Sequence, residues 1–225
     1  MNHKLCISLT ERTHEKCMEH VSSSKADIVE HRLDFMNRIE SLDEIYNVSE
    51  VPIIATCRSI QNGGRYNGSE EQRIKYLITA IQAGASFVDI EYGIDSRYLT
   101  MIEEESVQNE CKTIISKHYH QDTPSDSSLF ELIEQLSNSG ADIIKVVTTP
   151  ETTLDCLRTL QLYSMSSTNT HSLIAFSMGY MGRFTRLAAL FLGAPFMYVS
   201  QDGGVAAASG QIPFSKMREI LEVLH

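Results

Sequence analysis

Residues 140–151 read Gly-Ala-Asp-Ile-Ile-Lys-Val-Val-Thr-Thr-Pro-Glu, and this stretch contains the pattern from which the whole chain is built. Gly140 suits the left-handed residue that follows the end of a helix. The β-branched run after it predicts a buried strand. Thr149-Pro150-Glu151 then predicts a new helix, with proline at its first position and an acid in its first turn. The stretch therefore predicts one step of a strand–helix repeat.

The same Gly-Ala pair occurs at 84–85 and at 193–194, so the three pairs are 56 and 53 residues apart. Each interval fits two strand–helix units of about 27 residues, and the chain of 225 residues divides into eight such units. Apolar runs that we expect to form strands begin near residues 4, 27, 52, 87, 112, 142, 172 and 196. Strict alternation predicts parallel strands with right-handed crossovers, and hence one (β/α)8 barrel domain over residues 1–225. The alternative is an open doubly wound sheet, which usually carries a glycine-rich first turn that this chain lacks.

Composition excludes several classes of protein. The chain is 42% hydrophobic and 21% charged, which is too apolar for a disordered protein. No apolar run approaches the length of a membrane helix, and the first apolar stretch is too short for a secretory signal. The net charge of −10 disfavours binding to nucleic acid or to an anionic membrane surface. Five scattered cysteines without a C-x-x-C pair predict reduced thiols in the cytoplasm.

Polar side chains recur on one face of six consecutive expected strands. Catalytic residues of a (β/α)8 barrel come from the C-terminal ends of its strands, where inward-facing positions alternate with outward-facing ones. The recurring residues are Ser8, Glu30, Arg32, Asp34, Thr56, Arg58, Asp89, Glu91, Ser116, His118 and Lys145. Burying so many charges is costly unless they meet at a site. The cations among them, with Arg186, predict a positive pocket for a small anionic substrate.

Lys145 is the most informative of these residues, because it interrupts the apolar run 143–147. Burial lowers the pKa of a lysine and makes its neutral amine available as a nucleophile, which favours Schiff-base chemistry. His118, one strand earlier and on the same face, is a candidate acid–base residue or a hydrogen-bonded core histidine. Glu30 and Arg32 have the alternative interpretation of a structural ion pair.

Two further histidines have other interpretations. His31 faces the helix layer, which indicates a packing role. His120 forms an H-x-H motif with His118, which can bind a metal ion. The segments 177–186 and 201–213 are expected to be loops after the last two strands, rich in small residues that suit a lid or a phosphate site.

Seven motifs occur in an order that resembles the type I 3-dehydroquinate dehydratase family. They are E-H-R-L-D at 30–34, A-T-C-R at 55–58, D-I-E at 89–91, S-K-H at 116–118, D-I-I-K at 142–145, S-M-G-x-x-G-x-x-T-R at 177–186 and S-G-Q-I at 209–212. The resemblance spans the chain. It implies dehydration of 3-dehydroquinate to 3-dehydroshikimate in the shikimate pathway of aromatic amino-acid biosynthesis, by a cytoplasmic homodimer without cofactor or metal.

The resemblance also implies residue roles. Lys145 would form the imine with the C3 ketone, and His118 would take a C2 proton and later protonate the departing C1 hydroxyl. Arg186 would pair with the substrate carboxylate, as a planar guanidinium does well. The substrate hydroxyls would be contacted by Ser8, Glu30, Arg32, Arg58 and Gln211, and the supporting residues would be Asn62, Glu91, Met178 and Ser209.

Three positions depart from the family pattern. Asn62 stands where the family often has glutamate before two glycines, so a carboxylate that could raise the pKa of His118 is absent. Asn62 is equally suited to open the turn at Gly63. Ala207 replaces a loop serine, for which Ser209 could substitute, and Tyr119-His120 is an unusual pair after His118.

Three other functions remain open at this point. A class I aldolase of sugar phosphates would share the barrel, the lysine and the glycine loops. A metal-dependent hydrolase would use the H-x-H motif with Lys145. A barrel without catalytic activity could simply bind a carboxylate, although the presence of both Lys145 and His118 argues against it.

Overall fold

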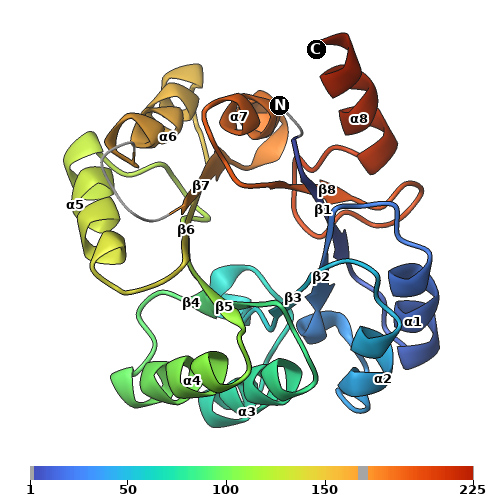
Figure 1. Cartoon of the computed structure of the whole chain (residues 1–225). Helices are drawn as coiled ribbons and strands as arrows, with labels where there is room; N and C mark the ends of the chain where they lie inside the picture. The colour runs from blue at the N-terminus through green and yellow to red at the C-terminus, as the bar shows by residue number, and fades with distance from the viewer. Residues whose placement is uncertain (1–2, 167–171, 225) are drawn as a thin grey trace. The chain divides into compact units, whose positions relative to one another are not determined.

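The computed structural model describes residues 3–166 and 172–224, in which strands and helices alternate along the chain (Figure 1). The strands are β1 Leu5–Leu9, β2 Ile28–Arg32, β3 Ile53–Thr56, β4 Phe87–Glu91, β5 Lys112–His118, β6 Ile143–Thr148, β7 Ser172–Ser177 and β8 Met197–Ser200. The helices are α1 His14–Ser22, α2 Leu42–Asn47, α3 Glu70–Gln82, α4 Ser96–Gln108, α5 Asp126–Ser137, α6 Thr153–Ser166, α7 Gly179–Phe191 and α8 Phe214–Val223. Two 3₁₀ turns, η1 Leu33–Phe35 and η2 Ile60–Asn62, follow β2 and β3. The eight predicted strands are confirmed.

The strands are hydrogen-bonded neighbours in the order β7-β6-β5-β4-β3-β2-β1-β8. Strands that are consecutive in sequence are therefore adjacent in the sheet, and β8 adjoins β1. A doubly wound sheet reverses its strand order partway, which this sheet does not do. The order confirms the predicted (β/α)8 fold class.

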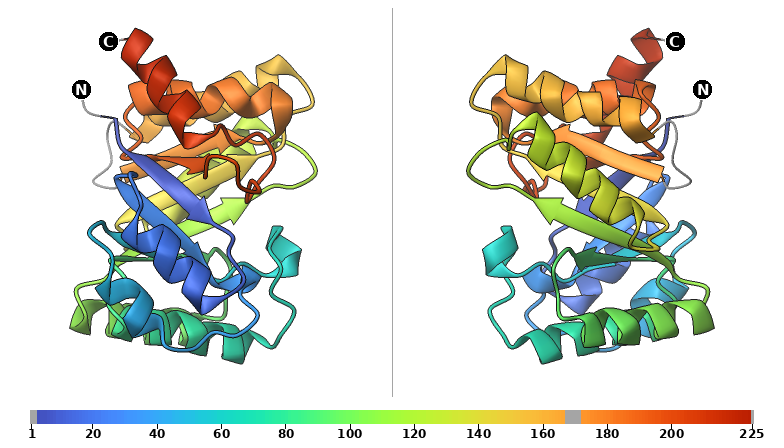
Figure 2. Two further views of the ribbon diagram at one scale, coloured as in Figure 1. Left: turned by 90° about the vertical axis from the view of Figure 1, so that its right-hand side faces the viewer. Right: turned by 90° about the vertical axis from the view of Figure 1, so that its left-hand side faces the viewer.

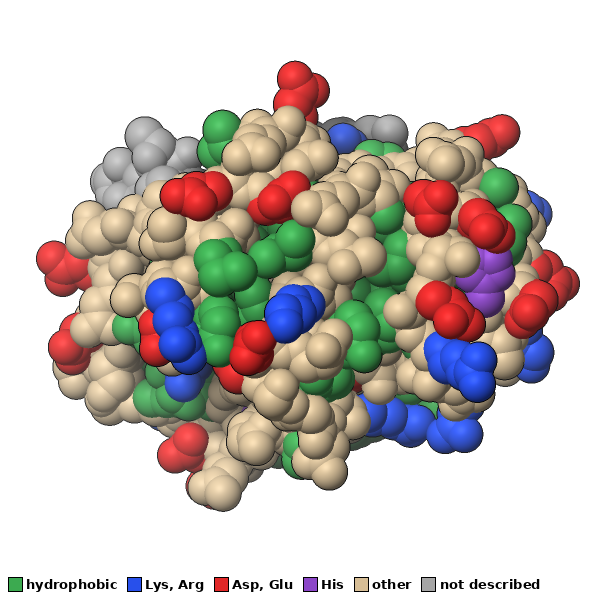
Figure 3. Space-filling view, turned by 90° about the horizontal axis from the view of Figure 1, so that it is seen from below, with side chains coloured by type: hydrophobic (Ala, Val, Ile, Leu, Met, Phe, Trp, Pro, Cys, Tyr) green, Lys and Arg blue, Asp and Glu red, His purple; other side chains and the backbone are tan. Residues whose placement is uncertain are grey.

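The chain divides into two compact units, residues 7–114 and residues 1–6 with 115–225. In the first unit, β2 pairs with β3 and β3 with β4, all in parallel. Figure 3 views the side formed by α3 and α4, where acidic, basic and hydrophobic side chains are mixed. In the second unit, β6 pairs in parallel with β7, and α6 and α7 pack together against β7 (Figure 2).

The glycines of the three Gly-Ala pairs end their helices as predicted. Gly84, Gly140 and Gly193 have φ angles of 101°, 79° and 109°, a region that a side chain would make strained. The predicted helix start at Thr149-Pro150-Glu151 is wrong, because α6 begins at Thr153. The Asp155 carboxylate accepts hydrogen bonds from the backbone N–H groups of Glu151 and Thr152, and this capping arrangement sets the start of the helix.

The segment 177–186, expected to be a loop, is mostly helix, because α7 begins at Gly179. A Cβ at Gly182 would lie 2.4 Å from the Ser177 carbonyl oxygen, so the missing side chain lets the first turn approach the end of β7. The Thr185 hydroxyl accepts a hydrogen bond from Ser177 N at 2.8 Å and fixes this approach. By contrast, residues 201–213 lie between β8 and α8 with only an isolated bridge between Ser200 and Pro213, as the loop prediction required.

His31 has the predicted packing role. It is fully buried on β2, with Nδ1 3.3 Å from the Tyr46 hydroxyl of α2. Burial lowers the pKa of His31 to about 4, so the ring is neutral at physiological pH.

Among the described residues, no helix has the length and apolarity required to span a membrane.

Candidate active site

Lys145 lies in the middle of β6 and is 4% exposed. Its strand neighbours from Ile143 to Val147 are buried and apolar. The side-chain nitrogen Nζ lies 4.0 Å from the centroid of the Tyr198 ring, which belongs to β8 and is itself buried. An amine that is enclosed in this way is withdrawn from bulk water, which is one way in which proteins activate a lysine as a nucleophile.

His118 is the last residue of β5, the strand beside β6 in the sheet. The turn after it is held to β6, since Tyr119 N donates to Val147 O at 2.8 Å and the Thr149 hydroxyl donates to Tyr119 O at 2.9 Å. The half-buried His118 ring stacks on the exposed His120 ring, with centroids 5.9 Å apart and planes 7° from parallel. Across residues 3–166 and 172–224, no cluster of three His, Cys, Asp or Glu side chains is arranged to hold a metal ion.

Arg186 projects from α7 and is 1% exposed. Its guanidinium carbon lies 4.1 Å from the centroid of the Phe176 ring of β7, and Nη2 donates to the Ser209 carbonyl at 3.4 Å. The same carbonyl accepts from Gly179 N at 3.2 Å. Ser209 thus joins the loop after β8 to the start of α7 through its backbone, and it does so beside the guanidinium.

Gln211 and its loop form a local hydrogen-bonded turn. The Gln211 side-chain oxygen accepts from Ala207 N at 2.8 Å and from Ala208 N at 3.4 Å. Gln211 is buried, Ala207 is half-buried and the Ser209 side chain is exposed. Met178, which directly follows β7, is half-buried and donates its backbone N–H to Thr148 O.

In the unit of residues 7–114, Ser8, Glu30 and Arg32 are all buried at or near strand ends. Arg32 does not pair with Glu30. It donates two hydrogen bonds to the Asp34 carboxylate, at 2.9 and 2.7 Å, while Glu30 accepts one from the Thr56 hydroxyl at 3.0 Å. Burial alone would lower the pKa of Arg32, but the Asp34 carboxylate outweighs it and the pKa lies above its ordinary value.

Arg58 lies just beyond β3 and pairs with two acids of β4. Its Nη2 donates to Asp89 at 2.6 Å, and its Nη1 lies 3.7 Å from a Glu91 oxygen. Burial opposes the charge of Arg58, yet these two carboxylates raise its pKa above the ordinary value. The charges of Arg32 and Arg58 are therefore balanced locally, and these two arginines do not supply the net positive charge that the sequence predicted.

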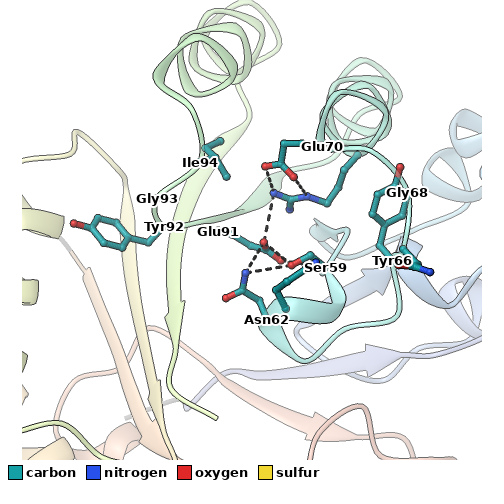
Figure 4. Close-up of a pocket in the computed structure, with 12 residues that line it drawn as sticks. Ser59, Asn62, Tyr66, Gly68, Glu70, Glu91, Tyr92, Gly93 and Ile94 are labelled. Carbon is teal, nitrogen blue, oxygen red and sulfur yellow. Dashed lines mark hydrogen bonds and ion pairs between the residues drawn. The ribbon is translucent and has the colours of Figure 1, made fainter. Parts of the chain in front are cut away.

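Glu91 organises the segment between β3 and α3 (Figure 4). Its carboxylate accepts hydrogen bonds from Ser59 N at 2.8 Å, from the Ser59 hydroxyl at 2.9 Å and from the Asn62 side-chain amide at 2.7 Å. The buried Arg73 guanidinium lies 3.4 Å away and also binds Glu70. These side chains line part of a pocket of about 350 Å³. The structure thus shows Asn62 bonded to Glu91, while its effect on His118 stays a prediction.

We expect Asn62→Asp to destabilise the protein, because a donor to Glu91 becomes a second carboxylate. Two facing carboxylates raise each other's pKa in the folded state above the unfolded value. Such a pair costs little at low pH, where it shares a proton, and its cost grows as pH rises through the raised pKa. In urea unfolding, the free energy of unfolding of the variant should be lower than that of the parent by roughly 1–3 kcal/mol at pH 8 and by a smaller amount at pH 5. Asn62→Ala removes the donor without adding charge, and an equal pH dependence of this variant would contradict the explanation.

The structure brings together several partners that the sequence did not identify. Asp34 and Asp89 are recognisable in sequence as acids on site-facing positions, but nothing there assigns them to Arg32 and Arg58. Tyr198 and Phe176, which lie against Lys145 and Arg186, look in sequence like ordinary strand aromatics. Each of these pairs is separated along the chain or depends on side-chain direction, so local patterns do not reveal it.

A protein-family model matches nearly the whole chain. The model described as "Type I 3-dehydroquinase" matches residues 5–225. Among solved structures, the 3-dehydroquinate dehydratase of Geobacillus kaustophilus is 25% identical with a TM-score of 0.91, covering 100% of this chain and 91% of that one. The enzyme of the same name from Aquifex aeolicus is 26% identical with a TM-score of 0.77, and 99% of each chain is covered.

Two curated relatives carry the same enzyme name as these structures and align with this chain over nearly their full length. A 3-dehydroquinate dehydratase from Desulfotalea psychrophila is 32% identical over 218 residues, 96% of each chain. One from Dehalococcoides mccartyi is 33% identical and covers 97% of this chain and 95% of its own. With a family model matched from residue 5 to residue 225 and relatives above 30% identity, this chain belongs to the type I 3-dehydroquinase family.

Proposed function

We propose that this chain dehydrates 3-dehydroquinate to 3-dehydroshikimate through an imine on Lys145, as a cytoplasmic step of the shikimate pathway. As a member of its family the protein is a hydro-lyase. The observation that carries the proposed mechanism is the burial of Lys145 in an apolar strand beside the strand that ends in His118. The family match also favours dehydration over the aldolase, metal-hydrolase and binding-only alternatives.

In the proposed reaction, the neutral Lys145 amine attacks the C3 ketone, and loss of water gives a protonated imine. This cation withdraws electrons from the adjacent C2–H bond, so His118 can remove the C2 proton to give an enamine. The enamine electrons then expel the C1 hydroxyl, which receives the C2-derived proton from His118 and leaves as water, and the lysine remains bound as a conjugated imine. Hydrolysis of the conjugated imine releases the product and restores the lysine. One imidazole can act as base and then as acid because its ordinary pKa lies near neutrality.

Other residues bind and position the substrate in this proposal. Arg186 pairs with the substrate carboxylate. The hydroxyls are contacted by Ser8, Glu30, Arg32, Arg58 and Gln211, and Glu91, Asn62, Met178 and Ser209 support them. The pairing of Arg32 with Asp34 and of Arg58 with Asp89 suits hydroxyl recognition, since paired guanidinium groups keep donors in fixed directions without demanding an anion.

A direct assay tests this function. Purified protein incubated with 3-dehydroquinate should produce a conjugated enone, which absorbs in the ultraviolet. Absence of the enone with a folded protein would refute the proposed activity.

Arg186→Ala should raise KM for the substrate by roughly 10- to 100-fold, since a charge-assisted pair to the carboxylate is lost. The measurement is steady-state kinetics with the substrate and with its carboxylate ester. The KM of the ester should differ little between the parent and the variant. Arg183→Ala is the matched control, because Arg183 is exposed on the same helix three residues away. If replacing the acid by its ester raised KM as much in the variant as in the parent, Arg186 would not have this role.

The proposed homodimer rests on the family resemblance. The proposed cytoplasmic location rests on that resemblance and on the cysteines. All five cysteines lie in the described part of the chain, are buried and form no disulfide, as a reducing compartment would require. Light scattering of the purified protein should give twice the chain mass of 25.3 kDa.

A further inference from the structure

The Lys145 side-chain nitrogen has an aromatic ring directly against it. Nζ lies 4.0 Å from the centroid of Tyr198, well inside the distance at which a ring face attracts a cation. Both residues are almost completely buried, Lys145 at 4% and Tyr198 at 3% exposure. Water therefore does little to weaken the contact.

The Tyr198 ring is fixed in this position by its own strand. It lies in β8, whose four residues are all buried, and it packs edge-on against Phe196 with centroids 5.5 Å apart and planes at 70°. The outward neighbours Met197 and Val199 are fully buried as well. Because the ring is buried and packs against Phe196, we expect its contact with Lys145 to persist when the lysine reacts.

We infer that Tyr198 is a catalytic residue whose ring face stabilises the cationic imine on Lys145 and holds its nitrogen in place. The inference rests on the proposed function, because it requires that Lys145 form the imine. The face of an aromatic ring carries partial negative charge, and the nitrogen is neutral when it attacks but cationic once the imine has formed. A contact that is stronger to the cation than to the neutral amine favours imine formation, and this difference contributes to the rate.

The test compares variants that keep or remove the ring. Tyr198→Phe should retain most of the activity, because the ring face remains. Tyr198→Leu should lower kcat by about 30-fold, the scale of a desolvated cation–π contact, with a smaller effect on KM. The amount of imine trapped by borohydride during turnover should fall in parallel. Tyr163→Leu, which removes another buried tyrosine of the same unit, controls for loss of stability and should leave kcat of the folded protein unchanged.

A second series of variants keeps the size of the side chain at position 198, so that misfolding does not explain a loss of activity. Phenylalanine with one, two or three ring fluorines at position 198 keeps the volume but progressively weakens the ring face. The logarithm of kcat should fall steadily along this series. Equal activity throughout the series, or a loss in Tyr198→Phe as large as in Tyr198→Leu, would overturn the inference. If the parent enzyme turned over substrate without any adduct on Lys145, the proposed mechanism itself would fail instead.

Discussion

Lys145→Ala should abolish turnover, with a loss of kcat on the order of 10⁶-fold, the scale seen when a covalent nucleophile is removed. The reason is that, in the proposed mechanism, the imine on Lys145 is the electron sink for removal of the C2 proton. Borohydride added with 3-dehydroquinate should reduce the imine and leave a substrate-derived mass on the peptide that contains Lys145. Mass spectrometry of the digested protein locates the adduct.

Lys117→Ala is the matched control for this experiment. Lys117 lies on β5, the strand beside β6, and its Nζ is 5.5 Å from the Tyr119 ring centroid, so it is another lysine next to an aromatic ring in the same unit. Its variant should keep both the adduct and the activity. An adduct on another peptide, or turnover without any adduct, would exclude the imine mechanism at Lys145.

The second large effect is expected for His118→Ala. This variant should lose about 10²–10⁴-fold in kcat, the usual contribution of a general acid–base group. It should still form the imine, because Lys145 and its aromatic contact are unchanged. Borohydride trapping should therefore label the variant fully even though product forms slowly, and this combination separates proton transfer from imine formation.

His120→Ala provides the comparison, because its ring stacks on His118 but is exposed at the start of the following loop. We expect a mild effect on kcat. If His120→Ala were crippling and His118→Ala mild, the proton-transfer role would belong to His120. If His118→Ala failed to form the adduct, His118 would act before the proton-transfer step.

The two units of the structure carry different parts of the proposed machinery. Residues 115–225 carry Lys145 and His118, the proposed reacting groups, and Arg186, the proposed partner of the substrate carboxylate. Residues 7–114 carry paired charges: Arg32 binds Asp34, while Arg58 and Glu91 each bind more than one partner. Such networks keep polar groups rigid, which favours recognition of a substrate with several hydroxyl groups.

The sequence by itself determined the fold class and indicated candidate site residues, whose roles stay predictions. The strand runs and the Gly-Ala pairs are local signals, because burial periodicity and a positive φ act within a few residues of the chain. Lys145 could be singled out as a candidate for the same reason, since a charge inside an apolar strand is visible without knowledge of its partners. The ordered motifs then indicated the family, which the comparisons confirm.

Only the tertiary structure decided which groups meet. Arg58 and Asp89 lie 31 residues apart in the chain, and their contact depends on the register of β3 with β4. The start of α7 at Gly179 depends on how closely the helix approaches Ser177, and the pairing of Asn62 with Glu91 depends on the path of the segment between β3 and α3. The Tyr198 ring reaches Lys145 from a strand more than 50 residues later in the chain. Strand register and side-chain direction arise from packing among distant segments, so a pattern read along the chain does not contain them.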